Sequence, residues 1–218
     1  MAITTDILAA LADYAHGRVP RAIRERQILG LAEDLFAEQG YANASMDELA
    51  RRAGVSKPVI YALVGSKERL YRRCVERHSE MLAARIATEA GRADGPEAQL
   101  RAGILAFFAF VNEHRRVWEA LTWDASPFAV EAAAIRRRQT ELAVTLLRDA
   151  AARLGATPDA QRLDAVAHAL NGAVEALARW WRDHQSISPE ELTDMAVDLL
   201  LPGLVHIVDV ITKEGAGS

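Results

Sequence analysis

Apolar residues recur at every third or fourth position along most of the chain, the spacing that places them on one face of an α-helix. On this pattern we predict helices over residues 21–39, 66–91, 97–113 and 130–154, a shorter helix around Trp118, and two last helices opened by Pro158-Asp159 and by residues 185–189. The alternation typical of β-strands is scarce. The sequence therefore predicts an all-α protein of about nine helices.

Residues 45–67 have the signals of two short helices joined by a tight turn. Ser45 is a good N-cap, and Glu48 three residues later predicts a capping box. Gly54 ends the first helix, because glycine readily takes the left-handed conformation found at helix ends. Ser56 is placed to cap the second helix, with Pro58 in its first turn, where a missing N–H is tolerated. Such a pair is typical of the helix-turn-helix, whose second helix enters the major groove of DNA.

The residues around this pair resemble the N-terminal domain of TetR-family transcriptional regulators. The resemblance runs from about residue 21 to residue 73 and is carried by Gly40-Tyr41, Ser45-Met46, Ala50, Gly54-Val55-Ser56-Lys57, Tyr61 and Ser66-Lys67-Glu68. It implies an N-terminal three-helix DNA-binding domain over residues 20–66 and a C-terminal helical domain for ligand sensing and dimerisation over residues 67–218. Residues 1–19 are expected to be an N-terminal extension. A short amphipathic helix and a mobile segment are both open alternatives for it.

The second helix of the pair is expected to present its outward positions to DNA. If Val55, Ile60 and Val64 pack inward, the positions left for contact are Lys57, Pro58, Val59, Tyr61, Ala62 and Leu63. Base-edge reading then falls largely to Pro58, Val59 and Ala62, which can only touch thymine methyl groups or exclude other groups. The resemblance assigns phosphate contacts to further side chains, and free N–H groups after the caps add to them. The candidate DNA-binding residues are Arg21, Arg24, Ser45, Arg52, Ser56, Lys57, Pro58, Val59, Tyr61, Ala62 and Lys67.

Charge and composition fit a protein that meets DNA at one end. The whole chain has a net charge of −4, but residues 20–73 hold 10 Lys and Arg against 7 Asp and Glu, which gives +3 there and −7 elsewhere. The single cysteine, Cys74, is expected to be an inert thiol in a reducing cytoplasm. The sequence contains no run of 18 apolar residues, so we expect no membrane span. We expect no enzyme, cofactor or bound metal, because the histidines and glycines form no catalytic, metal-binding or nucleotide-binding motif.

A small-molecule pocket is expected among the central helices, where aromatic residues gather. Its candidate residues are Phe107, Phe110, Trp118, Trp123 and Phe128, with His168, Asn171 and Glu175 as polar groups. Plain core packing of the phenylalanines and a solvent-facing stripe for the polar three remain open alternatives. On the penultimate helix, small residues recur at helical spacing from Ala165 to Ala176, and the last helix is apolar over a wide surface. Both features predict a homodimer formed through the last two helices.

The sequence thus predicts a cytoplasmic TetR-like regulator, most simply a repressor. Its partner is a near-palindromic double-stranded operator, from which an apolar or aromatic small molecule releases it. Two alternatives stay open. One is a regulator without a small-molecule effector, and the other is a ligand-binding or scaffolding dimer that no longer binds DNA.

Overall fold

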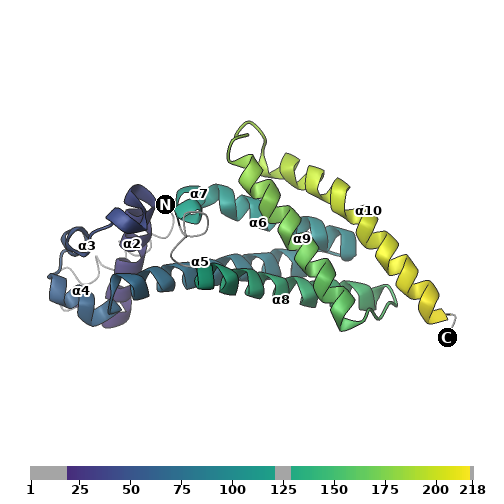
Figure 1. Cartoon of the computed structure of the whole chain (residues 1–218), viewed down its shortest axis with the longest axis horizontal. Helices are drawn as coiled ribbons and strands as arrows, with labels where there is room; N and C mark the ends of the chain where they lie inside the picture. Colours follow the sequence, from purple (N-terminus) through teal and green to yellow (C-terminus); the bar gives the residue numbers. More distant parts are fainter. Residues whose placement is uncertain (1–18, 121–128, 217–218) are drawn as a thin grey trace. The chain divides into compact units, whose positions relative to one another are not determined.

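The computed structural model describes residues 19–120 and 129–216, and within these ranges every regular element is a helix (Figure 1). In chain order the helices are α2 (Arg21–Asn43), α3 (Met46–Ala53), α4 (Lys57–Val64), α5 (Lys67–Arg92), α6 (Pro96–Glu113), α7 (Arg115–Trp118), α8 (Ala129–Arg153), α9 (Ala160–Trp181) and α10 (Pro189–Ala216). The predicted all-α class is confirmed. Among these described helices, none is long and apolar enough to cross a membrane. The N-terminal extension, apart from its last residue, lies outside the described residues.

The helices belong to two compact units. The first contains the chain up to His78 together with residues 115–132, and the second contains residues 79–114 and 133–218, as far as these are described. The predicted helix-turn-helix stretch lies within the first unit, which also takes in the beginning of α5. The rest of α5 belongs to the second unit. α5 therefore contributes residues to both units, as does α8 (Ala129–Arg153), whose residues up to Ala132 belong to the first unit.

The core of the first unit consists of the apolar faces of α2, α3, α4 and the start of α5. Ile28, Ile60 and Leu70 are fully buried there. The Phe36 ring meets the Tyr71 ring edge to face, with the ring centroids 5.2 Å apart. Cys74 is also fully buried, and this burial raises the pKa of its thiol well above the usual value. The cysteine therefore has the environment of the inert thiol expected from the sequence.

One carboxylate is buried in the same unit. Glu33 on α2 is 4% exposed, and its Oε1 lies 3.3 Å from Nη1 of Arg77 and 3.5 Å from Nδ1 of His78, both on α5. A buried carboxylate is tolerated only with such partners. The ion pair therefore fixes α5 to α2 through a contact that is costly to break.

The turns follow the glycine signals of the sequence. α2 loses its helical backbone at Gly40, with a φ of 72°, and α3 ends at Gly54, with a φ of 65°. The N–H of Gly54 bonds to the carbonyl of Arg51, and the N–H of Val55 bonds to the carbonyl of Ala50 at 3.1 Å. This bonding pattern is a Schellman motif, and it sets the angle at which the chain enters α4.

The capping signals are confirmed in position but not in every bond. The Ser45 hydroxyl caps α3 by accepting the N–H of Asp47 at 3.2 Å. The predicted capping box is wrong, because the Glu48 carboxylate bonds instead to the guanidinium groups of Arg51 and Arg52. Ser56 occupies the N-cap position of α4 but makes no side-chain capping bond.

The second unit contains α6, α9, α10, the rest of α5 and α8 from Ala133 onward. α6 packs along α10, and an ion pair between Arg101 and Asp194 links the two helices. A reciprocal capping box starts α10: the Ser188 N–H donates to Glu191 at 2.8 Å, and the Glu191 N–H donates to the Ser188 hydroxyl at 3.1 Å. In the preceding turn, the Trp181 indole donates to the Ile187 carbonyl at 2.7 Å. The link between α9 and α10 is therefore well fixed.

Candidate DNA interface and ligand pocket

Helix α4 separates its residues sharply into buried and exposed sets. Ile60 and Val64 are 0% and 1% exposed, whereas Val59 and Tyr61 are 41% and 42% exposed. The neighbouring residues of the outward face that are also exposed are Lys57, Pro58 and Ala62. The predicted inward positions of Ile60 and Val64 and these five outward positions are therefore confirmed, whereas the predicted inward Val55 and outward Leu63 are both half-buried. The outward face holds one cation, one phenol and three apolar side chains.

Several of the predicted basic contacts are bonded within the first unit. The Lys57 ammonium lies 2.9 Å from the Asp47 carboxylate, and both side chains are exposed. Arg21 forms an exposed pair with Glu25 at 2.8 Å. Pairs of this kind are weak in water. They leave the cations available to a stronger anionic partner such as a phosphate.

Arg24 and Arg52 are half-buried and bond to groups on the neighbouring helix. Arg52 is only 23% exposed, and its guanidinium bonds to Glu38 on α2 at 2.6 Å and to Glu48 on α3 at 2.8 Å. Hydrogen bonds from Arg51 and then Arg52 lower the pKa of Glu48 to about 2. Arg24 donates to the carbonyl of Ala53 at 3.3 Å. Both arginines connect α2 to α3, so in this structure they hold the helix-turn-helix together.

Lys67 lies just after α4, at the start of α5. Its ammonium donates to the Ala42 carbonyl at 3.1 Å and sits 4.7 Å from the centroid of the Tyr41 ring. Partial burial lowers the pKa of this lysine. The Gly40-Tyr41 and Ser66-Lys67 parts of the family resemblance are therefore in direct contact.

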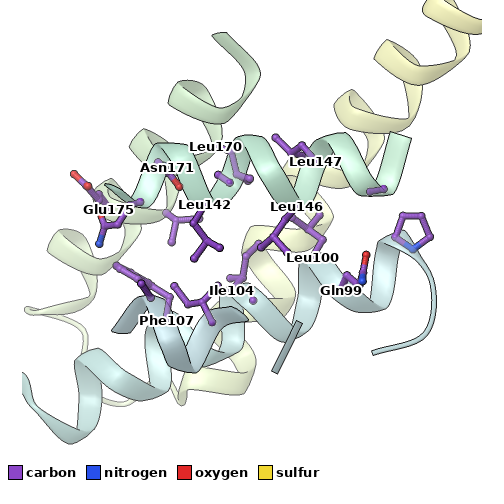
Figure 2. A pocket seen from close by; sticks show the side chains of 18 residues that line it. Gln99, Leu100, Ile104, Phe107, Leu142, Leu146, Leu147, Leu170, Asn171 and Glu175 are labelled. Atoms are coloured by element: carbon purple, nitrogen blue, oxygen red, sulfur yellow. The ribbon is translucent and has the colours of Figure 1, made fainter. Parts of the chain in front are cut away.

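The second unit contains an apolar pocket of about 110 Å³ (Figure 2). Four helices line it: α5 with Ala83 and Ile86, α6 with residues from Pro96 to Phe107, α8 with residues from Gln139 to Ala150, and α9 with residues from Leu170 to Glu175. Figure 2 shows Asn171 and Glu175 at one end and Gln99 at the other, with leucines and Ile104 between them. The pocket is thus a hydrophobic space with polar groups at its ends, as is typical of small-molecule sites.

The structure brings together only part of the predicted ligand set. Phe107, Asn171 and Glu175 line the pocket. His168 lines a polar hollow of about 670 Å³ between α8 and α9, which shares Asn171 and Glu175 with the pocket. Phe110 is buried without lining either space, and Trp118 is buried in the first unit. The remaining two residues, Trp123 and Phe128, lie outside the described residues.

Sequence reasoning missed two amides in the pocket lining, Gln99 and Gln139. A signal was present, because Gln139 lies on the inward stripe of α8 between Ile135 and Leu142, where a polar side chain is unexpected. The Gln139 Nε2 atom is buried and has no hydrogen-bond partner in the structure. Next to it, Asn171 Nδ2 donates to Oγ1 of Thr140 at 3.2 Å.

A second apolar hollow of about 110 Å³ adjoins the pocket. The two share Pro96, Leu100, Leu147 and Ala150, and the second hollow extends along α10 to Ile211. Glu175, at the opposite end of the pocket, has a raised pKa because burial disfavours its charged form. The apolar space therefore runs from a partly buried carboxyl group on α9 to the aliphatic side chains of α10.

The last two helices expose more apolar surface than the rest of the second unit. Met195, Leu199 and Val205 on α10 are 53%, 68% and 51% exposed, and Trp180 near the end of α9 is 41% exposed. The small residues that recur at helical spacing along α9 are also exposed, at Ala165, Ala169, Gly172 and Ala176. Exposed apolar side chains that gather on two helices are typical of interaction surfaces.

Comparisons with known proteins agree with both units. Residues 28–74 match the model of the bacterial regulatory proteins of the tetR family, and residues 96–203 match the tetracyclin repressor-like C-terminal domain. The HTH-type transcriptional activator FasR of Mycolicibacterium smegmatis is 29% identical over 191 residues, which are 87% of each chain.

Solved structures give the same result. A TetR-like transcriptional regulator from Rhodococcus sp. RHA1 is 32% identical, with a TM-score of 0.67 over 86% of this chain and 99% of its own. The transcriptional regulator FadR from Bacillus subtilis, solved in complex with stearoyl-CoA, shares the fold at 16% identity, with a TM-score of 0.70 over 80% of this chain and 96% of its own. The helix-turn-helix geometry and these matches together show that this chain belongs to the TetR family of DNA-binding transcriptional regulators.

Proposed function

We propose that the protein is a homodimeric repressor that binds a near-palindromic operator and is released from it by an apolar small molecule. The observation that carries the DNA part is the outward face of α4, where Lys57, Tyr61 and three apolar side chains are exposed over a buried Ile60 and Val64. A helix presented in this way fits the major groove. Two such helices related by a two-fold axis would read two half-sites about one helical turn apart.

In this proposal, most of the basic residues position the protein on the DNA backbone. Lys57, Tyr61 and Lys67 contact phosphates, together with Arg21 and the backbone N–H groups that follow Ser45 and Ser56. Arg24 and Arg52 support the helix pair instead, because both are bonded within it.

Base reading falls to Pro58, Val59 and Ala62, which have no hydrogen-bonding side chain. They contact thymine methyl groups and exclude other bases by shape. The change Val59→Thr tests this role, because it adds a hydroxyl at the same volume. If the base preference at every operator position is unchanged, Val59 does not read the DNA.

Ligand release is proposed to act through α5. This helix places Leu70 and Cys74 in the core of the first unit, and Ala83 and Ile86 in the pocket of the second. A ligand in the pocket favours a state in which α5 is tilted. In that state the two α4 helices of the dimer no longer match the spacing of the operator half-sites. The effect depends on the difference between the ligand's affinities for the two states. FadR with stearoyl-CoA is a precedent in which a protein of this fold holds an acyl chain.

The homodimer is proposed to form through α9 and α10, because the exposed Leu199, Met195 and small-residue stripe lie on these helices. Activation is the alternative to repression that one comparison favours, since the M. smegmatis relative is named an activator. A promoter–reporter measurement with and without the protein distinguishes repression from activation. Repression predicts higher reporter output when the protein is deleted.

The decisive experiment is fluorescence anisotropy with the DNA upstream of this protein's own gene, at a low and a high salt concentration. Native protein should bind tightly, and affinity should fall steeply with salt, because phosphate contacts release counterions. The double variant Lys57→Ala, Tyr61→Ala should lose most of this binding. A matched control is Arg148→Ala, which removes an exposed cation from α8 in the other unit. Equal binding by the double variant and the native chain would refute the assigned interface.

A further inference from the structure

One residue that lines the pocket has a buried hydrogen-bond donor without a partner among the described residues. The Gln139 Nε2 atom is shielded from solvent and bonds to no atom of the structure, although the side chain lines the pocket. A buried amide without a partner costs free energy, so such groups are rare unless a bound molecule completes them. Most of the surrounding lining, including Leu142 and Ala143, is aliphatic and offers no acceptor. The missing partner is therefore expected to be an acceptor on the occupant.

The charge of the pocket restricts that occupant further. Among the described lining residues, Glu175 is the one ionisable group of this pocket and no cation lines it, whereas Arg162 lines the adjoining hollow. Arg179 lies 3.7 Å from the Glu175 carboxylate, but neither it nor Arg136 belongs to the lining, and Arg136 lines the neighbouring polar hollow. Burial already raises the pKa of Glu175. A second carboxylate placed beside it in an apolar space would be strongly disfavoured.

The shape of the apolar space gives the direction of the occupant. Asn171 and Glu175 of α9 lie together at one end in Figure 2, and Gln139 lines the same pocket from α8, one helical turn before Leu142. From there the aliphatic lining continues past Leu100 and Leu147, which also line the adjoining hollow along α10. A molecule longer than the first hollow can therefore extend its apolar part into the second.

We propose that the pocket selects an elongated, uncharged amphiphile whose acceptor oxygen accepts a hydrogen bond from Gln139 Nε2 while its apolar tail runs past Leu100 and Leu147 towards α10. Amides and esters with an alkyl chain have this chemistry, whereas the corresponding free acids carry a carboxylate at neutral pH. The inference rests on the proposed function in that it assigns the ligand class of the same pocket. Gln139 acts as the residue that recognises the acceptor, and Glu175 excludes anions.

The test is titration calorimetry of the full chain at neutral pH with four probes: decanamide, methyl decanoate, decanoic acid and butylbenzene. Decanamide and methyl decanoate should bind at least about tenfold more tightly than decanoic acid, because the acid must bury a charge. Gln139→Leu should weaken decanamide about fivefold or more and leave butylbenzene, which has no acceptor, unchanged. The control Gln161→Leu, an exposed glutamine of α9 outside these pockets, should change neither.

A second variant tests the exclusion of anions by Glu175. Glu175→Gln removes the negative charge at nearly constant volume and should raise the affinity for decanoic acid severalfold, while the exposed Glu76→Gln on α5 should not. Binding of decanoic acid as tight as that of decanamide in the native chain would overturn the proposal. Failure of all four probes to bind, or equal loss of decanamide and butylbenzene in Gln139→Leu, would also overturn it.

These outcomes are separable from those of the proposed function. Operator anisotropy measured with saturating decanamide reports release from DNA, whereas calorimetry reports occupancy alone. Selective binding without release would leave the ligand class intact and refute ligand-controlled repression. Release by decanoic acid as effective as release by decanamide would leave the repressor intact and refute the ligand class.

Discussion

The turn between α3 and α4 allows a test in which backbone conformation alone changes. Gly54 has a φ of 65°, and a Cβ built on it meets no atom within 4 Å. Gly54→Ala therefore introduces no clash, and its cost is that of the left-handed conformation for an L-residue, about 1–2 kcal/mol. For a chain of this size, we expect the melting temperature to fall by about 2–8 °C.

Gly91 near the end of α5 is the matched control. It is helical, and a Cβ added there also meets nothing within 4 Å. Gly91→Ala should therefore stabilise the protein by up to about 1 kcal/mol, because alanine favours the helix. The same substitution is thus expected to lower stability at Gly54 and to raise it at Gly91, although neither site is crowded. Gly54→Asn should recover part of the loss, since asparagine tolerates the left-handed region.

Thermal unfolding followed by circular dichroism measures all three variants. Well below the melting temperature, Gly54→Ala should keep its operator affinity within about threefold, because alanine can still adopt the turn at the cost given above. If Gly54→Ala melts with the native chain, or if both alanine variants shift in the same direction, the turn does not depend on the left-handed conformation. The account of how α4 is presented would then be wrong.

Three further outcomes are expected. Asp47→Asn removes the exposed partner that Lys57 must give up to bind a phosphate, so operator affinity measured by anisotropy should rise a few-fold at low salt and converge with the native value at high salt. Glu175 has a raised pKa in the folded chain, so the folded state binds more protons than the unfolded state, and stability falls as pH rises from about 4.5 through the folded pKa. Glu175→Gln should therefore melt higher than the native chain at neutral pH and should lose this dependence; equal melting curves across the pH series would contradict it. Burial raises the pKa of Cys74, so a thiol reagent should modify the native chain far more slowly than the chain in guanidinium, and equal rates would contradict the buried position.

The helix-turn-helix was predictable from the sequence because its signals are local. Ser45, Gly54 and Pro58 each act within one turn of a helix, and helical periodicity alone placed Ile60 and Val64 inward. Even so, the bonds of Glu48 and Arg52 were not predictable. Glu48 has several possible donors within reach, and one of the partners of Arg52, Glu38, comes from the preceding helix and becomes a neighbour only after folding.

The pocket is the opposite case. The aromatic cluster suggested it, but Phe110 and Trp118 are buried elsewhere, because aromatic enrichment does not distinguish a ligand site from a core. Its lining comes from α5, α6, α8 and α9. The role proposed for Gln139 depends on the residues that these helices place around it. Local propensities and helical period, which depend on near neighbours in the chain, determined the fold class and the DNA-facing helix. The packing of helices distant in sequence decided the ligand site, because a cavity exists only where surfaces from several helices fail to fill the space between them.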